Sequence, residues 1–213
     1  ADGQEINYFD YSDDLATSKK NNIYLGTVSR VEPSLQAAFI EFGSEKKAFL
    51  PFDEIHPSYF KIPHNEKMLK NGSQKNNEID DEKENKKHFL SFYRKYKIQD
   101  VIKKDQVLLI QIVKEERGTK GAAVTTFISL PGRYSVLLPN NSSTGGVSKK
   151  ISNPLDRKRL KRLHDNFNLP DGMSLIIRTN AISAEDEDII ADFSYLRKLW
   201  TKIREDTLKS KAP

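Results

Sequence analysis

Five short segments rich in β-branched and aromatic residues, separated from one another by turn residues, constrain the fold of this chain more than any other feature. Such segments are typical of β-strands, and several of them in close succession are typical of a small β-barrel. They cover residues 23–31, 35–42, 47–51, 107–113 and 122–128. The sequence therefore predicts a five-stranded barrel.

The pattern changes near residues 127–130, and we expect a second unit of mixed strands and helices after that point. Residues 134–138 and 175–179 have the composition of strands. A helix is predicted to begin at Asn153, because Asn is a favoured N-cap and the following Pro suits the first helical position. A second helix is predicted after a cap-like Ser183. The apolar residues expected on the buried faces of the two helices are Leu155, Leu160, Leu163 and Phe167, and then Ile189, Phe193, Leu196, Trp200 and Ile203.

The amino-acid composition favours one kind of partner and excludes several kinds of site. Lys and Arg together number 35 against 30 Asp and Glu, and the net charge of +5 weakly favours an anionic partner. The absence of cysteine excludes a disulfide scaffold, a thiolate zinc site and a cysteine nucleophile within this stretch. No apolar run approaches the roughly 18 residues of a membrane helix. The chain begins at Ala1 with neither Met nor a signal peptide, so we expect a fragment of a cytoplasmic protein.

Residues 64–88 differ from the rest of the chain. They are rich in Asn, Lys and acids and contain almost nothing to bury, which predicts a mobile surface insertion. Their charges nearly balance, and this argues against a nucleic-acid-binding tail.

Two phenylalanines of the predicted barrel fall on the polar face of their strands. Side chains alternate between faces along a strand, so Phe39 shares a face with Glu41, and Phe49 shares a face with Lys47. A hairpin through residues 43–45 pairs position 39 with position 49. The aromatic pair is then either a platform on which bases stack or a surface covered by a loop, and the pattern alone weighs these equally.

The segment 114–121 joins the last two predicted strands and carries three cations on a turn that contains glycine. They are Lys114, Arg117 and Lys120. A solvated charged hairpin is one interpretation. Beside the aromatic pair, the same loop would contact phosphates next to a stacking surface.

Four segments, at residues 22–43, 48–51, 114–132 and 177–179, resemble the N-terminal half of the ribonuclease E/G family. The resemblance implies an α+β chain: an OB-fold barrel of the S-one type followed by a small 5′-sensor domain. It divides the chain into a remnant of a ribonuclease-H-like domain at 1–18, the five-stranded S-one-type OB-fold domain at 19–126 and the 5′-sensor at 127–213.

The resemblance also implies two sets of RNA-binding residues. The stacking aromatics of the family correspond to Phe39 and Phe49, and its basic barrel residue corresponds to Lys120. The family binds a 5′-monophosphate at positions that match Arg178, Thr179, Gly132 and Val136. The alternative for Arg178 is an ordinary ion pair with an acid of the cluster 185–188.

The family cleaves RNA with Mg²⁺ held by aspartates of a downstream nuclease domain, which this chain lacks. The acids at 185–188 belong to a helix N-terminus and point around the helix, so they do not converge on one ion. We therefore expect no catalytic residue, metal or cofactor here, and an inactive fragment of a Mg²⁺-dependent endoribonuclease of RNA decay and processing. The expected partner is single-stranded RNA with a 5′-monophosphate and not a small molecule. The resemblance further implies a homo-oligomeric parent and leaves its membrane association open. The alternative is a stand-alone single-stranded RNA-binding module.

Overall fold

The computed structural model describes residues 18–61, 93–141 and 145–213. The insertion predicted at 64–88 lies outside these ranges, as does the remnant predicted at 1–18 except for Ser18. No helix in the described ranges combines the length and the hydropathy that a membrane span requires.

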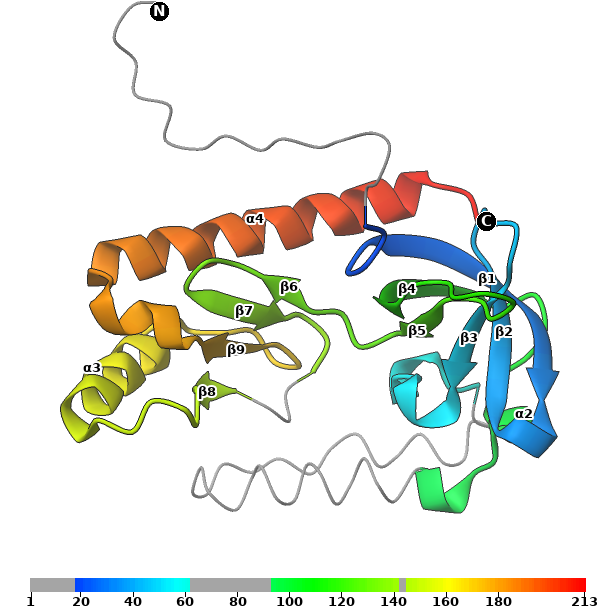
Figure 1. Ribbon diagram of the computed structural model, residues 1–213, viewed down its shortest axis with the longest axis horizontal. Coiled ribbons are helices and arrows are strands. Elements are labelled where there is room, and N and C mark those ends of the chain that lie inside the picture. Colours follow the sequence, from blue (N-terminus) through cyan, green and yellow to red (C-terminus); the bar gives the residue numbers. More distant parts are fainter. Residues whose placement is uncertain (1–17, 62–92, 142–144) are drawn as a thin grey trace, which may run out of the picture.

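A closed five-stranded barrel forms the first unit, as predicted, and Figure 1 shows it at one end of the molecule. Its strands are β1 (Ile23–Glu32), β2 (Ala37–Glu41), β3 (Ala48–Pro51), β4 (Val107–Lys114) and β5 (Ala123–Thr125). They pair in the order β1-β2-β3-β5-β4, and only the contact between β3 and β5 is parallel. This arrangement is an OB-type barrel of the S-one type.

The barrel interior is built from the inward faces of these strands. Ala38, Ile40 and Phe42 are buried, which confirms the core face predicted for the second strand. Short helical turns cover one end of the barrel with further apolar side chains: η2 (Phe52–Glu54), η3 (Pro57–Tyr59) and α2 (Ile98–Val101). Gly26 of β1 lies so close to the core that a Cβ there would meet Ile40 Cγ2 at 2.5 Å.

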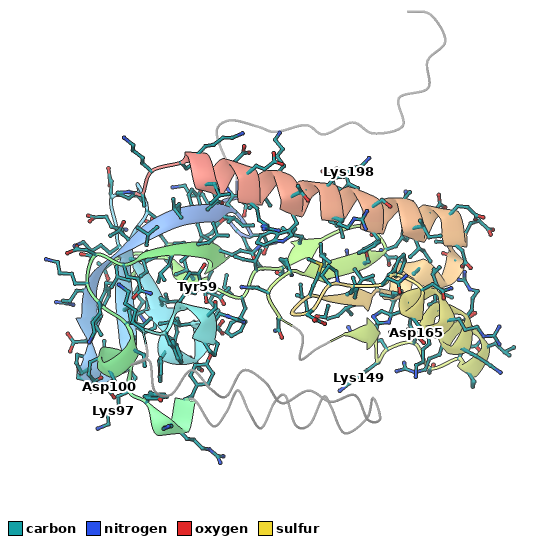
Figure 2. All side chains as sticks on the ribbon, turned by 180° about the vertical axis from the view of Figure 1, so that it is seen from behind. Tyr59, Lys97, Asp100, Lys149, Asp165 and Lys198 are labelled. Atoms are coloured by element: carbon teal, nitrogen blue, oxygen red, sulfur yellow. The ribbon has the colours of Figure 1, made fainter. Side chains whose placement is uncertain are left out.

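The second unit is a four-stranded sheet flanked by two helices. Its strands are β6 (Leu130–Pro131), β7 (Ser135–Leu138), β8 (Gly146–Val147) and β9 (Ser174–Ile177), in the order β6-β7-β9-β8. Its helical elements are α3 (Pro154–Asp165), the 3₁₀ turn η5 (Thr179–Ser183) and α4 (Asp186–Lys209). Helix α4 packs on β6 and β7, whereas α3 packs on β8 and β9. Figure 2 shows Lys198 of α4 and Asp165 of α3 on different sides of this unit.

The two helix starts agree only in part with the predictions. Asn153 is the N-cap of α3, as predicted, and its side chain accepts a hydrogen bond from the Leu155 backbone N–H at 2.9 Å. Leu155 itself is 78% exposed, so its predicted place on the buried face is wrong. Five residues separate it from Leu160, and at 3.6 residues per turn this spacing turns the side chain about 140° away. The predicted cap at Ser183 is also wrong, because η5 ends at that residue and Glu185 is the N-cap of α4.

Helix α4 connects the two units. Phe193 and Leu196 are buried against the second sheet, and Trp200 and Ile203 belong to the same cluster as predicted. That cluster includes Ile23 of β1 and Leu109 of β4 on the barrel, and Figure 1 shows α4 extending from the second sheet toward the barrel. The helix therefore fixes the barrel wall relative to the second sheet.

Candidate nucleic-acid interface

Five residues form a continuous row across the outer wall of the barrel. The strand register pairs Arg30 with Phe39, Phe39 with Phe49, Phe49 with Ala123, and Ala123 with Lys114. Directly opposed residues of neighbouring strands project from the same face of a sheet. An aromatic pair therefore lies at the centre of the row, with a cation at each end.

The geometry of the pair agrees with the pairing predicted from the alternation. Phe39 lies opposite Phe49, and their ring centroids are 5.9 Å apart in an edge-to-face arrangement. Both rings are half-buried, whereas Ile40 and Leu50, their neighbours in sequence, are fully buried on the inner face. The two rings are thus surface residues with accessible area.

Arg30 is a member of this row that the sequence analysis missed. Its guanidinium carbon lies 4.8 Å from the centroid of the Phe39 ring, in a cation–π arrangement. Strict alternation from the buried Val28 would have placed Arg30 inside the barrel. A β-bulge between these two residues adds one position, at Ser29, and this extra position turns Arg30 outward. Arg30 also lies 4.0 Å from the Glu32 carboxylate, an exposed pair that contributes little to stability.

The predicted basic loop lies against the hairpin that carries the aromatic pair. Lys46 Nζ donates to the Gly118 carbonyl oxygen at 2.6 Å, and Ser44 Oγ donates to the Glu116 carboxylate at 2.6 Å. A Cβ on Gly121 would lie 2.0 Å from the Lys47 carbonyl oxygen, so only glycine permits this close approach. The loop and the β2–β3 hairpin therefore form one surface.

The two acids of this loop form hydrogen bonds with groups outside the row. Glu115 accepts hydrogen bonds from the Ser18 hydroxyl and the Lys20 backbone N–H, and these donors lower the pKa of its carboxyl group. Glu116 is occupied by Ser44. The predicted cations Lys114, Arg117 and Lys120 are all exposed, as is Lys47, whose Nζ donates to Ser29 Oγ at 2.5 Å. The three exposed cations of the loop therefore outnumber its one exposed acid, Glu115.

The phosphate-site residues predicted in the second unit lie near one another. Arg178 follows β9, and its backbone N–H donates to the Tyr134 carbonyl oxygen at 2.8 Å. Its Nη1 donates to the Gly132 carbonyl oxygen at 2.5 Å, which joins two of the predicted residues. Val136 is half-buried on β7, and Thr179 is exposed at the start of η5.

The alternative of an ion pair between Arg178 and the acidic cluster does not occur. Within the cluster 185–188, all of which the structure describes, Asp186 forms an ion pair, and its partner is Arg159 of α3 at 2.6 Å. The guanidinium of Arg159 also donates to the carbonyl oxygens of residues 181, 182 and 184. Arg159 thus supports the turn after Thr179, and Arg178 is exposed.

A single carboxylate that the sequence analysis missed organises the neighbouring turn. Asp192 of α4 accepts hydrogen bonds from the backbone N–H groups of Arg133, Tyr134 and Ser135, and from the Ser135 hydroxyl, at 2.7–3.2 Å. A Cβ on Gly132 would meet its carboxylate at 2.5 Å. The turn that holds Arg178 therefore depends on glycine and on a residue about sixty positions away along the chain.

The described ranges contain no group of three or more His, Cys, Asp or Glu side chains that could hold a metal ion.

The closed barrel with its outward aromatic pair defines an S-one-type OB fold. Comparison with known proteins then shows which proteins the chain is similar to. Residues 129–213 match the ribonuclease E/G family. Ribonuclease E of Escherichia coli (strain K12) is 39% identical over 212 residues, which is 100% of this chain and 17% of that protein. The resemblance is confirmed, and the chain is homologous to ribonuclease E/G family proteins.

Two further relatives have nearly the same sequence identity. Ribonuclease E of Buchnera aphidicola subsp. Schizaphis graminum is 38% identical over 212 residues, covering 100% of this chain and 19% of that protein. Ribonuclease G of Salmonella typhimurium is 38% identical over 184 residues, covering 86% of this chain and 32% of that protein. The chain thus spans about a fifth of the length of these ribonuclease E relatives.

Proposed function

We propose that the chain binds single-stranded RNA across the outer wall of its barrel. The observation that carries this proposal is the register-defined row in which Phe39 and Phe49 lie between Arg30 and Lys114. Unpaired bases stack on accessible aromatic rings, and each stack contributes about 1–3 kcal/mol without demanding a particular base.

The cations at the two ends of the row are suited to the RNA backbone. The guanidinium carbon of Arg30 lies 4.8 Å from the centroid of the Phe39 ring, so its charge is close to the phosphate of a base that stacks on the accessible part of the aromatic pair. On the other side, Lys114 and the loop with Arg117 and Lys120 present positive charge next to Phe49. An aromatic surface flanked by cations is the usual means of binding single strands without sequence preference.

A comparison of single-stranded with fully duplex RNA of the same sequence tests this proposal. Stacking on Phe39 and Phe49 requires bases that are free of a partner, so fluorescence anisotropy should show markedly weaker binding to the duplex. Both RNAs carry phosphate charge, so duplex RNA also controls for attraction by charge alone. Equal affinity for the two forms would contradict stacking as the mode of binding.

We further propose that the second unit recognises a 5′-monophosphate through Arg178 and Thr179. The Gly132 carbonyl oxygen holds one guanidinium nitrogen of Arg178, and the side chain is otherwise exposed. A guanidinium fork binds phosphate oxygens bidentately, and the Thr179 hydroxyl supplies a further donor. Gly132 supplies that carbonyl oxygen, and Val136 lies on β7, which pairs with the strand that precedes Arg178.

The parent protein is proposed to be a Mg²⁺-dependent endoribonuclease, homo-oligomeric and cytoplasmic, that acts in RNA processing and decay. This chain is proposed to contribute RNA recognition and no hydrolysis, because in-line displacement at phosphate needs converging carboxylates to hold the metal. Incubating purified chain with RNA and Mg²⁺ tests this. Cleavage that is lost when the acids at 185–188 are replaced would contradict it.

A stand-alone RNA-binding module is the second candidate for the whole protein. The reading frame of the parent gene distinguishes the endoribonuclease from the stand-alone module. A continuation past Pro213 into an aspartate-bearing nuclease segment supports the endoribonuclease, and a stop codon there supports the module.

A further inference from the structure

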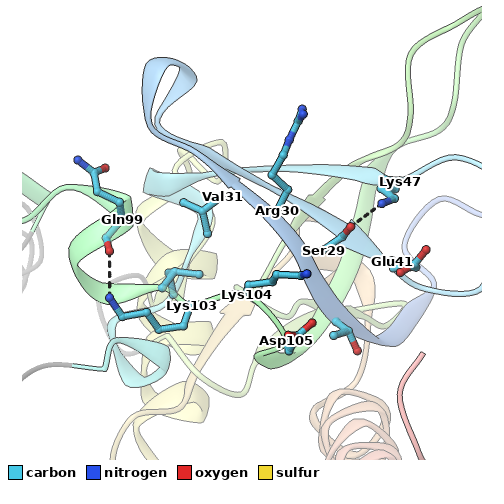
Figure 3. A pocket seen from close by; sticks show the side chains of 11 residues that line it. Ser29, Arg30, Val31, Glu41, Lys47, Gln99, Lys103, Lys104 and Asp105 are labelled. Carbon is cyan, nitrogen blue, oxygen red and sulfur yellow. Dashed lines mark hydrogen bonds between the residues drawn. The ribbon is translucent and has the colours of Figure 1, made fainter.

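A basic groove lies next to the aromatic row. Its volume is about 860 Å³, and it is bounded by β1 on one side and by the loop that precedes β4 on the other (Figure 3). Four cations line it, namely Arg30, Lys47, Lys103 and Lys104, against two acids, Glu41 and Asp105. The groove is therefore positively charged.

The loop that carries Lys103 and Lys104 is held in place by backbone contacts. The Asp105 N–H donates to the Val28 carbonyl oxygen and the Val28 N–H donates to the Gln106 carbonyl oxygen, each at 2.8 Å. Gln106 is buried, and its side-chain amide donates to the Tyr59 carbonyl oxygen at 2.7 Å. Beneath the two lysines Ile102 is 1% exposed and belongs to the barrel core. The lysines thus project from a fixed segment.

The groove is continuous with the row through β1. Arg30 lines the groove and also lies over the ring of Phe39. Ser29, the bulged residue beside it, lines the groove and accepts the hydrogen bond of Lys47, as Figure 3 shows. An RNA strand that passes over Phe49 on β3 and then over Phe39 on β2 would reach this groove next.

The chemistry of the lining favours phosphate and ribose over bases. The described residues that line the groove include no aromatic side chain, and they supply ammonium groups and the hydroxyls of Thr27 and Ser29. Phosphate oxygens accept hydrogen bonds from both kinds of donor. Lys103 Nζ already donates to the Gln99 carbonyl oxygen at 3.2 Å, which directs its charge along the groove wall.

We propose that this groove is a second contact for the backbone of the same RNA strand, in which Lys103 and Lys104 hold phosphates beyond the base stacked on Phe39. This inference rests on the proposed RNA binding by the row. In this arrangement the groove binds one end of the RNA segment that crosses the barrel. The loop 114–121 binds the other end.

Oligonucleotides of two lengths test the proposal on the full chain. About four and about twelve nucleotides lie within the range of site sizes known for OB folds. Replacing both lysines (Lys103→Ala with Lys104→Ala) should weaken binding of the long oligonucleotide about tenfold at low salt and leave the short one nearly unchanged. Each phosphate that the variant no longer neutralises should lower the slope of log affinity against log salt by about 0.7 for the long oligonucleotide.

Lys198→Ala with Lys202→Ala is the matched control. It removes the same charge from exposed positions of α4, and Figure 2 shows Lys198 on the outer side of that helix. An equal loss in this control, or an equal loss for both lengths of oligonucleotide, would overturn the groove as a specific contact. So would unchanged affinity and salt dependence for the long oligonucleotide.

The double phenylalanine variant separates this inference from the function on which it rests. If Phe39→Ala with Phe49→Ala abolishes binding while the groove variant binds both lengths normally, the groove proposal fails and binding by the row stands. If the phenylalanine variant binds both lengths normally, the proposed function itself fails.

Discussion

The barrel row and the Arg178 surface are both candidate RNA contacts, but different structures hold them in place. Phe39 and Phe49 project from strands whose opposite faces form the barrel core, so the strand pairing that folds the barrel also positions the rings. Arg178 depends on the turn at 132–135, and that turn is held by the single carboxylate of Asp192 on α4. The row should therefore tolerate the loss of Asp192, whereas the Arg178 surface should not.

The largest effect is expected from removing the aromatic pair. Phe39→Ala with Phe49→Ala should weaken binding of single-stranded RNA by about 2–4 kcal/mol, because one to two base stacks are lost. Folding should change little, since both rings lie on the outer wall. Titration and thermal unfolding measure the two quantities separately. Loss of folding in Phe39→Ala alone would show that this ring belongs to the core.

Asp192→Ala is the sharpest test of the contrast. It removes the acceptor for four donors of the 132–135 turn, and we expect a loss of about 2 kcal/mol of stability, the scale of hydrogen bonds to a charged group. Any preference for a 5′-monophosphate should disappear, while binding to the barrel row stays as before. Glu205→Ala, an exposed acid of the same helix, is the control. Equal weakening of barrel binding by Asp192→Ala would break the comparison.

Arg178→Ala should produce a more limited effect. We expect it to remove a preference of about 1–3 kcal/mol for a 5′-monophosphate over a 5′-hydroxyl, the scale of a set of charge-assisted contacts. Arg178→Lys keeps the charge but not the planar fork, so it should restore the preference only in part. Oligonucleotides that differ only at the 5′ end provide the measurement. Equal affinity of the unchanged chain for both ends would rule the site out.

The smallest expected effect is on the stability of the barrel as a function of pH. Burial lowers the pKa of His56 from its ordinary value of 6.5, and its Nδ1 accepts from the Ser58 backbone N–H at 3.1 Å. Below pH 6.5 the unfolded chain takes up this proton more readily than the folded chain, so stability falls as pH falls from 6.5 toward the lowered pKa. His56→Gln should flatten the unfolding temperature over that window. An unchanged pH profile would show that other groups govern acid sensitivity.

Much of the barrel surface could be predicted because it follows from local periodicity. The two-residue alternation around Phe39 and Phe49, together with the short hairpin, is enough to pair the rings and separate them from Ile40 and Leu50. The N-cap of α3 could be predicted for the same reason, because Asn153 and Pro154 act on the first helical turn, which follows them directly in the chain.

Three features could be decided only by the tertiary structure. Arg30 reaches the outer wall through a bulge opposite β2, and a bulge is a property of two paired strands that reverses the alternation of one of them. Asp192 reaches the turn at 132–135 because α4 packs on β6 and β7, and no local pattern relates the two segments. The groove lined by Lys103 and Lys104 exists because the loop before β4 bonds to β1. The alternation of side chains along the strands and the cap of α3 depend on near neighbours in the chain, so local patterns predict them. Contacts between distant segments decided where the charges around the aromatic pair and around Arg178 came together.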